Sequence, residues 1–242
     1  MDGSLSIAAH HQGGQYTPDH HLRRGHRTAY GSATIIVTSA TASYTRWLAH
    51  LHRNLKFFGR GDQLTVCAED EPTADFARSR GLRVLQQSAS SNALDGRRSV
   101  GETYMTQAWY RLVHGKQFCV WGLLARSADG ATILLLDGDI TLFRDPLPVL
   151  PPVNLAFMDD RWRRTTDFYN SGFFMVRASA ATRAFGKLYV DALRANSSKS
   201  RNDQSVLNEL IGRGRATLPI IPSYLDGEAF QNGARFYVDR DR

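Results

Sequence analysis

The residues best suited to chemistry are the two carboxylates of Asp137-Gly138-Asp139, which follow the apolar run at 132–136. Such a run predicts a central strand of a parallel sheet, and open parallel sheets bind ligands outside the carboxyl ends of their strands. Side chains two apart on extended backbone point the same way, and Gly138 lets a ligand approach the backbone closely. Hard oxygen ligands of this kind suit Mg²⁺ or Mn²⁺, which bridge diphosphates. The triplet therefore predicts a divalent metal site that also binds a phosphorylated substrate.

Two other interpretations of the triplet stay open. Asp-Gly is a common turn pair, so the segment could simply be a tight turn after a strand. The segment also resembles the nucleophile motif of haloacid-dehalogenase-like phosphatases, in which Asp137 attacks phosphorus and Asp139 acts as acid and base. Asp159-Asp160 supplies a later acidic pair. The spacing argues against a phosphatase, because three strand–helix units precede Asp137 and only about twenty residues separate the two acidic motifs.

The elements that position the triplet form an alternating pattern of strands and helices. Short β-branched or apolar runs predict strands at 34–38, 64–67, 82–85, 132–136, 155–158, 172–176 and 216–221. Amphipathic segments with capping or stop signals predict helices at 44–58, 73–80, 103–114, 116–126, 179–193 and 203–211. Gly81 and Gly212 are predicted to end helices, and Gly115 to separate two of them. The order predicts an α/β fold whose sheet is mixed but mainly parallel and is flanked by helices.

Composition limits the classes of protein that fit. The chain has 242 residues, 42% of them hydrophobic, and a formal charge of +7. Length and composition predict one globular domain at 32–242, preceded by a disordered tail at 1–31 that is rich in His and Gly. The positive charge favours an anionic ligand, but no basic stripe or zinc-finger spacing indicates nucleic acid. No apolar run approaches the length of a membrane span, and we expect no signal peptide.

The two cysteines, Cys67 and Cys119, are too few for a disulfide framework. Each lies in an apolar run, and we expect each to be a small core residue. Neither has the spacing of a metal site.

Three motifs, in order, resemble the nucleotide-diphospho-sugar transferases of glycosyltransferase family 77. The stretch at 134–147 reads Leu-Leu-Leu-Asp-Gly-Asp-Ile-Thr-Leu-Phe-Arg-Asp-Pro-Leu, and resembles the family's metal-binding stretch. Asn170-Ser171-Gly172 and the following Phe-Phe resemble its Asn-x-Gly-Phe-Phe segment, and residues 203–208 resemble its Asp-Gln-x-x-Leu-Asn helix start. The similarity runs from about residue 34 to about residue 237. It implies a Rossmann-like GT-A fold and a metal-dependent glycosyltransferase.

The resemblance also implies roles for individual residues. Asp137 and Asp139 are the expected ligands of Mn²⁺ or Mg²⁺, and Asp203 and Gln204 are expected beside the anomeric carbon as catalytic residues. The expected substrate-binding residues are Thr38, Ser39, Tyr44, Lys116, Asp137, Gly138, Asn170, Ser171 and Gly172. The donor is expected to be a nucleoside-diphosphate sugar, most simply UDP-linked, and the acceptor a glycan or glycoprotein hydroxyl, with the anomeric configuration retained. The resemblance implies the Golgi lumen as the compartment. Beside the resemblance, helix capping by Asp203 and a turn at Asn170 are the alternative structural roles.

The chain departs from the family pattern in two places. The family leads us to expect a His metal ligand shortly after 231–237, whereas no His follows His114. It also leads us to expect an N-terminal membrane anchor, which the sequence lacks. A C-terminally truncated domain, an incomplete gene model, a weakened metal site and a non-catalytic binding domain are therefore open alternatives. Arg161-Trp162-Arg163-Arg164 is a candidate for gripping the acceptor.

Overall fold

The computed structural model describes residues 34–86, 106–160, 169–197, 201–227 and 229–230, which all lie within one compact unit at 32–242. Its strands are β1 (Thr34–Ala40), β2 (Leu64–Ala68), β3 (Arg83–Gln86), β4 (Thr132–Leu136), β5 (Leu155–Asp159), β6 (Tyr169–Arg177) and β7 (Ser223–Tyr224). Its α-helices are α1 (Thr45–Phe57), α2 (Glu71–Ser79), α3 (Gln107–Arg126), α4 (Ala180–Ala195) and α5 (Asp203–Gly214). Short 3-10 helices occur at η1 (Ala42–Tyr44), η2 (Gly61–Gln63) and η3 (Leu147–Val149).

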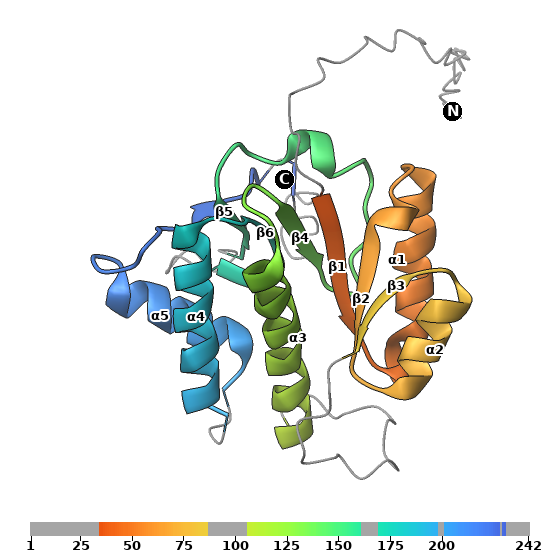
Figure 1. Cartoon of the computed structure of the whole chain (residues 1–242), viewed down its shortest axis with the longest axis horizontal. Helices are drawn as coiled ribbons and strands as arrows, with labels where there is room; N and C mark the ends of the chain where they lie inside the picture. Colours follow the sequence, from red (N-terminus) through yellow and green to blue (C-terminus); the bar gives the residue numbers. More distant parts are fainter. Residues whose placement is uncertain (1–33, 87–105, 161–168, 198–200, 228, 231–242) are drawn as a thin grey trace, which may run out of the picture. The chain divides into compact units, whose positions relative to one another are not determined.

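The seven strands form one sheet in the order β3-β2-β1-β4-β6-β5-β7 (Figure 1). β1, β2, β3 and β4 are parallel to one another, β6 runs antiparallel to both β4 and β5, and β7 is parallel to β5. The mixed, mainly parallel sheet confirms the predicted fold class. Because β6 lies between β4 and β5, the segment after residue 169 is brought beside the end of β4.

Alternate residues of the strands face two separate apolar layers. On one side, α1 and α2 pack against residues such as Ile36, Val66 and Leu134. On the other, α3, α4 and α5 pack against Val37, Leu135 and their neighbours. Figure 1 shows these two sets of helices on opposite sides of the sheet. Two-sided burial explains why the strands read as continuous apolar runs.

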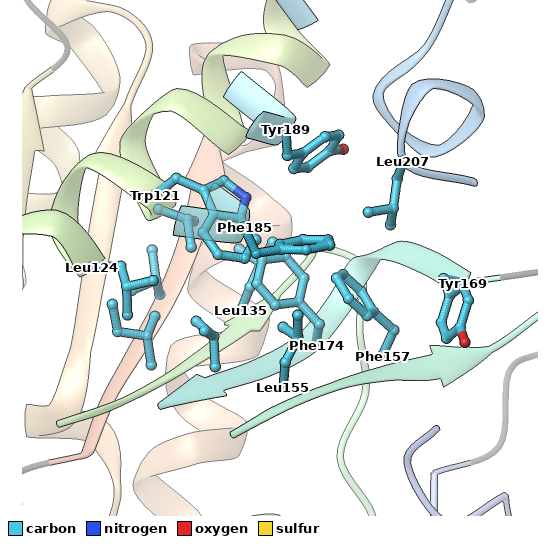
Figure 2. Close-up of a cluster of buried hydrophobic side chains, with 14 of the residues drawn as sticks. Trp121, Leu124, Leu135, Leu155, Phe157, Tyr169, Phe174, Phe185, Tyr189 and Leu207 are labelled. Atoms are coloured by element: carbon cyan, nitrogen blue, oxygen red, sulfur yellow. The ribbon is translucent and has the colours of Figure 1, made fainter. Parts of the chain in front are cut away.

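Aromatic rings fill the layer under α3, α4 and α5 (Figure 2). Trp121 stacks on Phe174 with ring centroids 5.6 Å apart, and Phe174 contacts Phe157 at 4.9 Å. A Cβ on Gly186 of α4 would lie 2.4 Å from Trp121, so glycine there lets α3 and α4 approach closely. This packing fixes α3, whose N-terminal half faces the polar edge of the sheet.

Two helix ends follow the sequence signals closely. Ser179 caps α4 in a reciprocal capping box with Thr182, as the sequence predicts for Ser179. Gly81 follows α2 with a φ of 72°, a left-handed conformation that favours glycine. In the described residues, no helix is both long enough and apolar enough to cross a bilayer.

Three predicted features are wrong. Gly115 does not divide two helices, because α3 continues through it, and α5 likewise continues past Gly212 to Gly214. A helix-interior glycine costs only about 1 kcal/mol relative to alanine, which packing on both sides of α3 offsets. Residues 216–221 form turns, bends and irregular backbone, and the last strand among the described residues is β7, which begins two residues further on.

The interpretation of both cysteines as ordinary core residues is also wrong. Cys67 of β2 and Cys119 of α3 form a disulfide that links segments 52 residues apart in sequence. Both residues do belong to the apolar layer, where Cys67 is fully buried. The pairing depends on α3 crossing over β2, which the spacing of two cysteines does not reveal.

Candidate active site

Polar residues gather where β1 and β4 end side by side. The two strands are paired in parallel up to Val37 and Leu135. The residues that follow each strand therefore lie at the same edge of the sheet, where the carboxyl ends of the strands meet. A Cβ on Gly138 would lie 3.9 Å from both the Ser39 carbonyl oxygen and the Thr38 Oγ1. Thr38, Ser39 and Gly138 are thus brought together, as the sequence predicts.

The acidic triplet forms a turn rather than an extension of the strand. β4 ends at Leu136, the Asp137 N–H donates to the Gly172 carbonyl at 2.8 Å, and Ile140 N–H donates to the Asp137 carbonyl at 3.1 Å. The Asp137 carboxylate is half-buried, whereas Asp139 at the apex is exposed. The segment is therefore not extended, so the premise from which a common direction of the two side chains is predicted does not hold.

Lys116 of α3 lies between two carboxylates. Its Nζ is 2.9 Å from Asp137 Oδ1 and 3.5 Å from Asp203 Oδ2, and its side chain is 9% exposed. Burial alone would lower the pKa of Lys116, but Asp137 and Asp203 raise it above its ordinary value, so the ammonium stays charged. Burial raises the pKa of Asp137, an effect that Lys116 opposes. Lys116, which is predicted to bind the substrate, therefore forms ion pairs with Asp137 and Asp203 in this structure.

Gln117, which the sequence analysis did not single out, connects the site to the core. Its Nε2 donates to the Asp203 Oδ2 at 2.8 Å and to the Ser171 carbonyl at 2.9 Å, and its Oε1 accepts from Trp121 Nε1 at 3.3 Å. Tyr189 OH donates to the Asp203 carbonyl at 2.9 Å, and burial raises the pKa of that phenol well above its ordinary value. The sequence contains one signal for Gln117, which is its position as a polar residue on the face of α3 that packs against the sheet.

Asn170, Ser171 and Gly172 lie in an irregularity of β6. The register between β5 and β6 shifts at Phe157–Met158, so residues 171–173 have no partner on β5, whereas Asn170 pairs with Met158. Asn170 Oδ1 accepts from the Gly172 N–H at 2.7 Å. A Cβ on Gly172 would lie 2.0 Å from Asp137 Oδ2, so only glycine leaves room for that carboxylate. The irregularity of β6 thus places the Asn-Ser-Gly segment against the carboxylate of Asp137.

Asp203 and Gln204 open α5 at the same edge. The helix is capped by Asn202, whose Oδ1 accepts from Ser205 N–H at 2.7 Å, so Asp203 is not the cap. Asp203 is 4% exposed and its carboxylate faces α3. Gln204 Oε1 lies 3.4 Å from the Ser171 amide, and its Nε2 donates to Asp160 Oδ2 at 2.9 Å. Both predicted catalytic residues are therefore held beside the Asn-Ser-Gly bulge.

Ser39 and Tyr44 lie on the β1 side of the site. Ser39 Oγ donates to Glu69 Oε1 at 2.8 Å, and burial, with nearby Asp70, raises the pKa of Glu69 to about 7. Tyr44, 48% exposed, precedes α1 and, within the described ranges, shares no hydrogen bond with another predicted site residue. The structure thus brings together every predicted residue near β4 and leaves Tyr44 at the solvent-facing margin.

The family follows from a match over most of this fold. Residues 61–241 match the family described as "Nucleotide-diphospho-sugar transferase". The chain belongs to this family of glycosyltransferases. The match confirms the predicted family resemblance and contains the acidic triplet, the Asn-Ser-Gly bulge and the start of α5.

Individual relatives agree with the family and the fold. The chain is 28% identical over 225 residues to "Beta-arabinofuranosyltransferase RAY1" of Arabidopsis thaliana, covering 83% of this chain but 39% of that protein. The chain thus spans about two fifths of the length of the curated relative it matches. The apo form of the glycosyltransferase GlyE of Streptococcus pneumoniae is similar at a TM-score of 0.52 and 14% identity, covering 87% of this chain and 50% of GlyE.

A second solved structure supports the GT-A architecture. LgtC is a galactosyltransferase. The structure of one of its active-site mutants matches at a TM-score of 0.54 and 14% identity, over 86% of this chain and 82% of LgtC. At this identity the likeness concerns the fold. Together with the observed topology, it confirms the expected GT-A fold of the family domain.

The acidic triplet fits a divalent cation in part. Among the residues that the structure describes, no three His, Cys, Asp or Glu side chains are grouped to hold a metal. Asp137 and Asp139 are hard oxygen ligands, but Asp137 Oδ1 faces Lys116 and Asp137 Oδ2 occupies the space left by the missing side chain of Gly172. Two carboxylates suit a cation whose remaining ligands are water and diphosphate oxygens.

Several expectations lie outside the described residues. They concern the His-rich tail at 1–31, the basic group at 161–164 and the segment at 231–237 where the family leads us to expect a His.

Proposed function

We propose that the domain transfers a sugar from a nucleoside-diphosphate donor, UDP-linked, to a hydroxyl group of a glycan or glycoprotein, with retention of the anomeric configuration. The observation that carries the proposal is the meeting of three motifs at one edge of the sheet. Asp137, Asn170–Gly172 and Asp203–Gln204 come from β4, β6 and α5, and Lys116 and Gln117 of α3 join them by hydrogen bonds and ion pairs. The family match supports the choice of donor class.

The arrangement is suited to the departure of a diphosphate. Mn²⁺ or Mg²⁺, when held by Asp137 and Asp139, supplies positive charge that stabilises the leaving diphosphate. Lys116 keeps a permanent positive charge nearby, because two carboxylates hold it in its protonated form. Ser39, half-buried beside Gly138, is proposed to contact the nucleoside, with the fully buried Thr38 packed beneath it.

The residues at the start of α5 are proposed to act on the sugar. Gln204 is half-buried, and its amide is oriented by Ser171 and Asp160, so it can face a sugar ring without further ordering. Asp203, held by Gln117 and Lys116, adds negative charge behind the reacting carbon, where positive charge develops. Asn170 and Ser171 complete the pocket for sugar hydroxyls.

Two further proposals concern the donor sugar, for which RAY1 is the guide, and the compartment, for which the Cys67–Cys119 disulfide is the guide. The name of RAY1 specifies arabinofuranosyl transfer for that protein, so a pentose donor is to be tested beside hexoses. A Golgi lumen location agrees with the Cys67–Cys119 bond, because disulfides persist in oxidising compartments.

The first test is calorimetric titration of UDP into the protein with and without Mn²⁺. We expect Mn²⁺-dependent binding that Asp139→Ala abolishes and Asp62→Ala leaves unchanged, since both residues are exposed and Asp62 lies at the opposite edge of the sheet. UDP-pentoses and UDP-hexoses are then screened for hydrolysis. Binding without turnover would support the non-catalytic alternative, and phosphate release from a phosphomonoester without UDP binding would support the phosphatase.

A further inference from the structure

Helix α1 holds the chain that follows the acidic triplet. Asn54 makes two hydrogen bonds with one residue of that chain, its Nδ2 donating to the Leu142 carbonyl at 2.9 Å and its Oδ1 accepting from the Leu142 N–H at 2.6 Å. The bonds span 88 positions of sequence. An amide side chain that pairs with both polar groups of one residue fixes that residue in position and orientation.

Neighbouring contacts extend this attachment in both directions. One helical turn before Asn54, His50 Nε2 lies 3.3 Å from Thr141 Oγ1. Further along, Arg60 donates from Nε and Nη2 to Asp145 Oδ2 at 3.0 and 2.7 Å, and Asp145 Oδ1 accepts from the Leu147 N–H. The chain from Thr141 to Asp145 is therefore attached to α1 at its start and to Arg60, three residues after α1, at its end.

Asp139 stands at the apex of a turn that is anchored on both sides. On one side, the Asp137 N–H is bound to the Gly172 carbonyl of β6, and on the other, Leu142 is bound to Asn54. The side chain of Asp139 is exposed, and no hydrogen bond or ion pair of this carboxylate occurs among the described residues. Its place is consequently set by the backbone on which it stands.

We infer that Asn54 is a positioning residue for Asp139 and thereby determines the affinity of the triplet for a divalent cation. The inference rests on the proposed function, because it concerns the cation that the triplet is proposed to bind. Asn54 has no contact with the triplet itself and acts through the backbone of Leu142. Loss of its two bonds leaves that side of the turn attached only through His50 and Arg60, so the separation of the two carboxylates becomes less fixed.

The test measures Mn²⁺ affinity by electron paramagnetic resonance of free Mn²⁺ at saturating UDP, using the whole chain. We expect Asn54→Ala to weaken Mn²⁺ binding about tenfold. Asn54→Asp keeps the acceptor for Leu142 N–H and is expected to fall between. Asn196→Ala is the matched control, because Asn196 also donates from Nδ2 to a backbone carbonyl, of Ala192, at the end of α4.

The outcomes separate the inference from the function on which it rests. Wild-type Mn²⁺ affinity in folded Asn54→Ala would overturn the inference alone, as would equal losses in Asn54→Ala and Asn196→Ala. Failure of the unchanged protein to bind Mn²⁺ with UDP would overturn the proposed function and the inference together. If Asn54→Ala does not fold, the same affinity measurement on Asn54→Asp decides, and an undiminished affinity there contradicts the inference.

Discussion

At the scale of the residue, the site depends on how closely a carboxylate and a glycine approach. Gly172 leaves the space that Asp137 Oδ2 occupies, and the other oxygen of Asp137 faces Lys116. A methyl group in that space must displace the carboxylate or the bulge of β6. The position of the Asp137 carboxylate, and with it the ion pair to Lys116, therefore depends on residue 172 having no side chain.

Gly172→Ala is expected to lower the free energy of unfolding by about 1–3 kcal/mol, the usual cost of overpacking, and to abolish Mn²⁺-dependent UDP binding. Gly212→Ala is the control, because Gly212 lies in α5 with no atom within 4 Å of a new Cβ. It should raise the free energy of unfolding by about 0.5–1 kcal/mol. Chemical denaturation and calorimetry measure both quantities, and unchanged binding in Gly172→Ala would contradict the proposed place of Asp137.

A second prediction at the scale of the residue concerns Glu69 and the dependence of stability on pH. Its pKa is raised to about 7 from an ordinary 4.5, so the folded protein binds more protons than the unfolded chain between those values. Stability is then lost as pH rises from about 4.5 to about 7, and the loss persists above pH 7. Glu69→Gln keeps an oxygen acceptor for Ser39 and removes the charge.

The variant Glu69→Gln should be more stable than the unchanged protein above pH 7, on the order of 2 kcal/mol, and equal to it near pH 4. Urea denaturation at pH 4, 6 and 8 measures the difference. A stability difference that does not change with pH would show that Glu69 ionises normally in the folded protein.

At the scale of the element, α3 connects the core to the site. Its apolar face packs Trp121 against β6 and α4, and one turn earlier Gln117 and Lys116 bind the acids of the site. Between them, Cys119 ties the helix to β2. Because one helix carries all three contacts, a change in its attachment reaches the site.

Removal of the disulfide by Cys67→Ala with Cys119→Ala should destabilise the protein by about 2–4 kcal/mol. The closed loop of 52 residues gives about 4 kcal/mol in the chain-entropy relation, which is an upper value. Thermal unfolding of the oxidised protein, the reduced protein and the double variant makes the comparison. Equal unfolding temperatures before and after reduction would show that the bond does not constrain the chain.

At the scale of the whole molecule, we expect ligand binding and folding to be coupled, because the proposed site is built from β1, β4, β6, α3 and α5 together. UDP with Mn²⁺, the proposed ligand, is expected to bind only when these elements are assembled. At a UDP concentration one hundred times its dissociation constant, the complex should be more stable than the free protein by about 2.7 kcal/mol. Differential scanning calorimetry tests this, with Asp139→Ala as the variant expected to show no Mn²⁺-dependent increase.

The sequence by itself determined the strands β1 to β6, most of the helices and the position of the acidic triplet. Apolar runs such as Thr132–Leu136 mark buried strands, and Ser179 and Gly81 mark helix ends, because hydrophobic periodicity and capping act over a few residues. The fold class and family also follow from these local patterns and from the order of three motifs. Local rules failed at Gly115, where packing of the whole helix outweighed the weak propensity of one glycine.

The tertiary structure alone decided which side chains meet. The insertion of β6 between β4 and β5 places Gly172 against Asp137, and the crossing of α3 over the sheet brings Lys116 and Gln117 to Asp203. The same holds for the Cys67–Cys119 bond and for Asn54 with Leu142. The two residues of each pair lie 35 to 88 positions apart in sequence. Their contacts follow from strand order and helix packing, which depend on the burial of the entire chain and on no single segment of it.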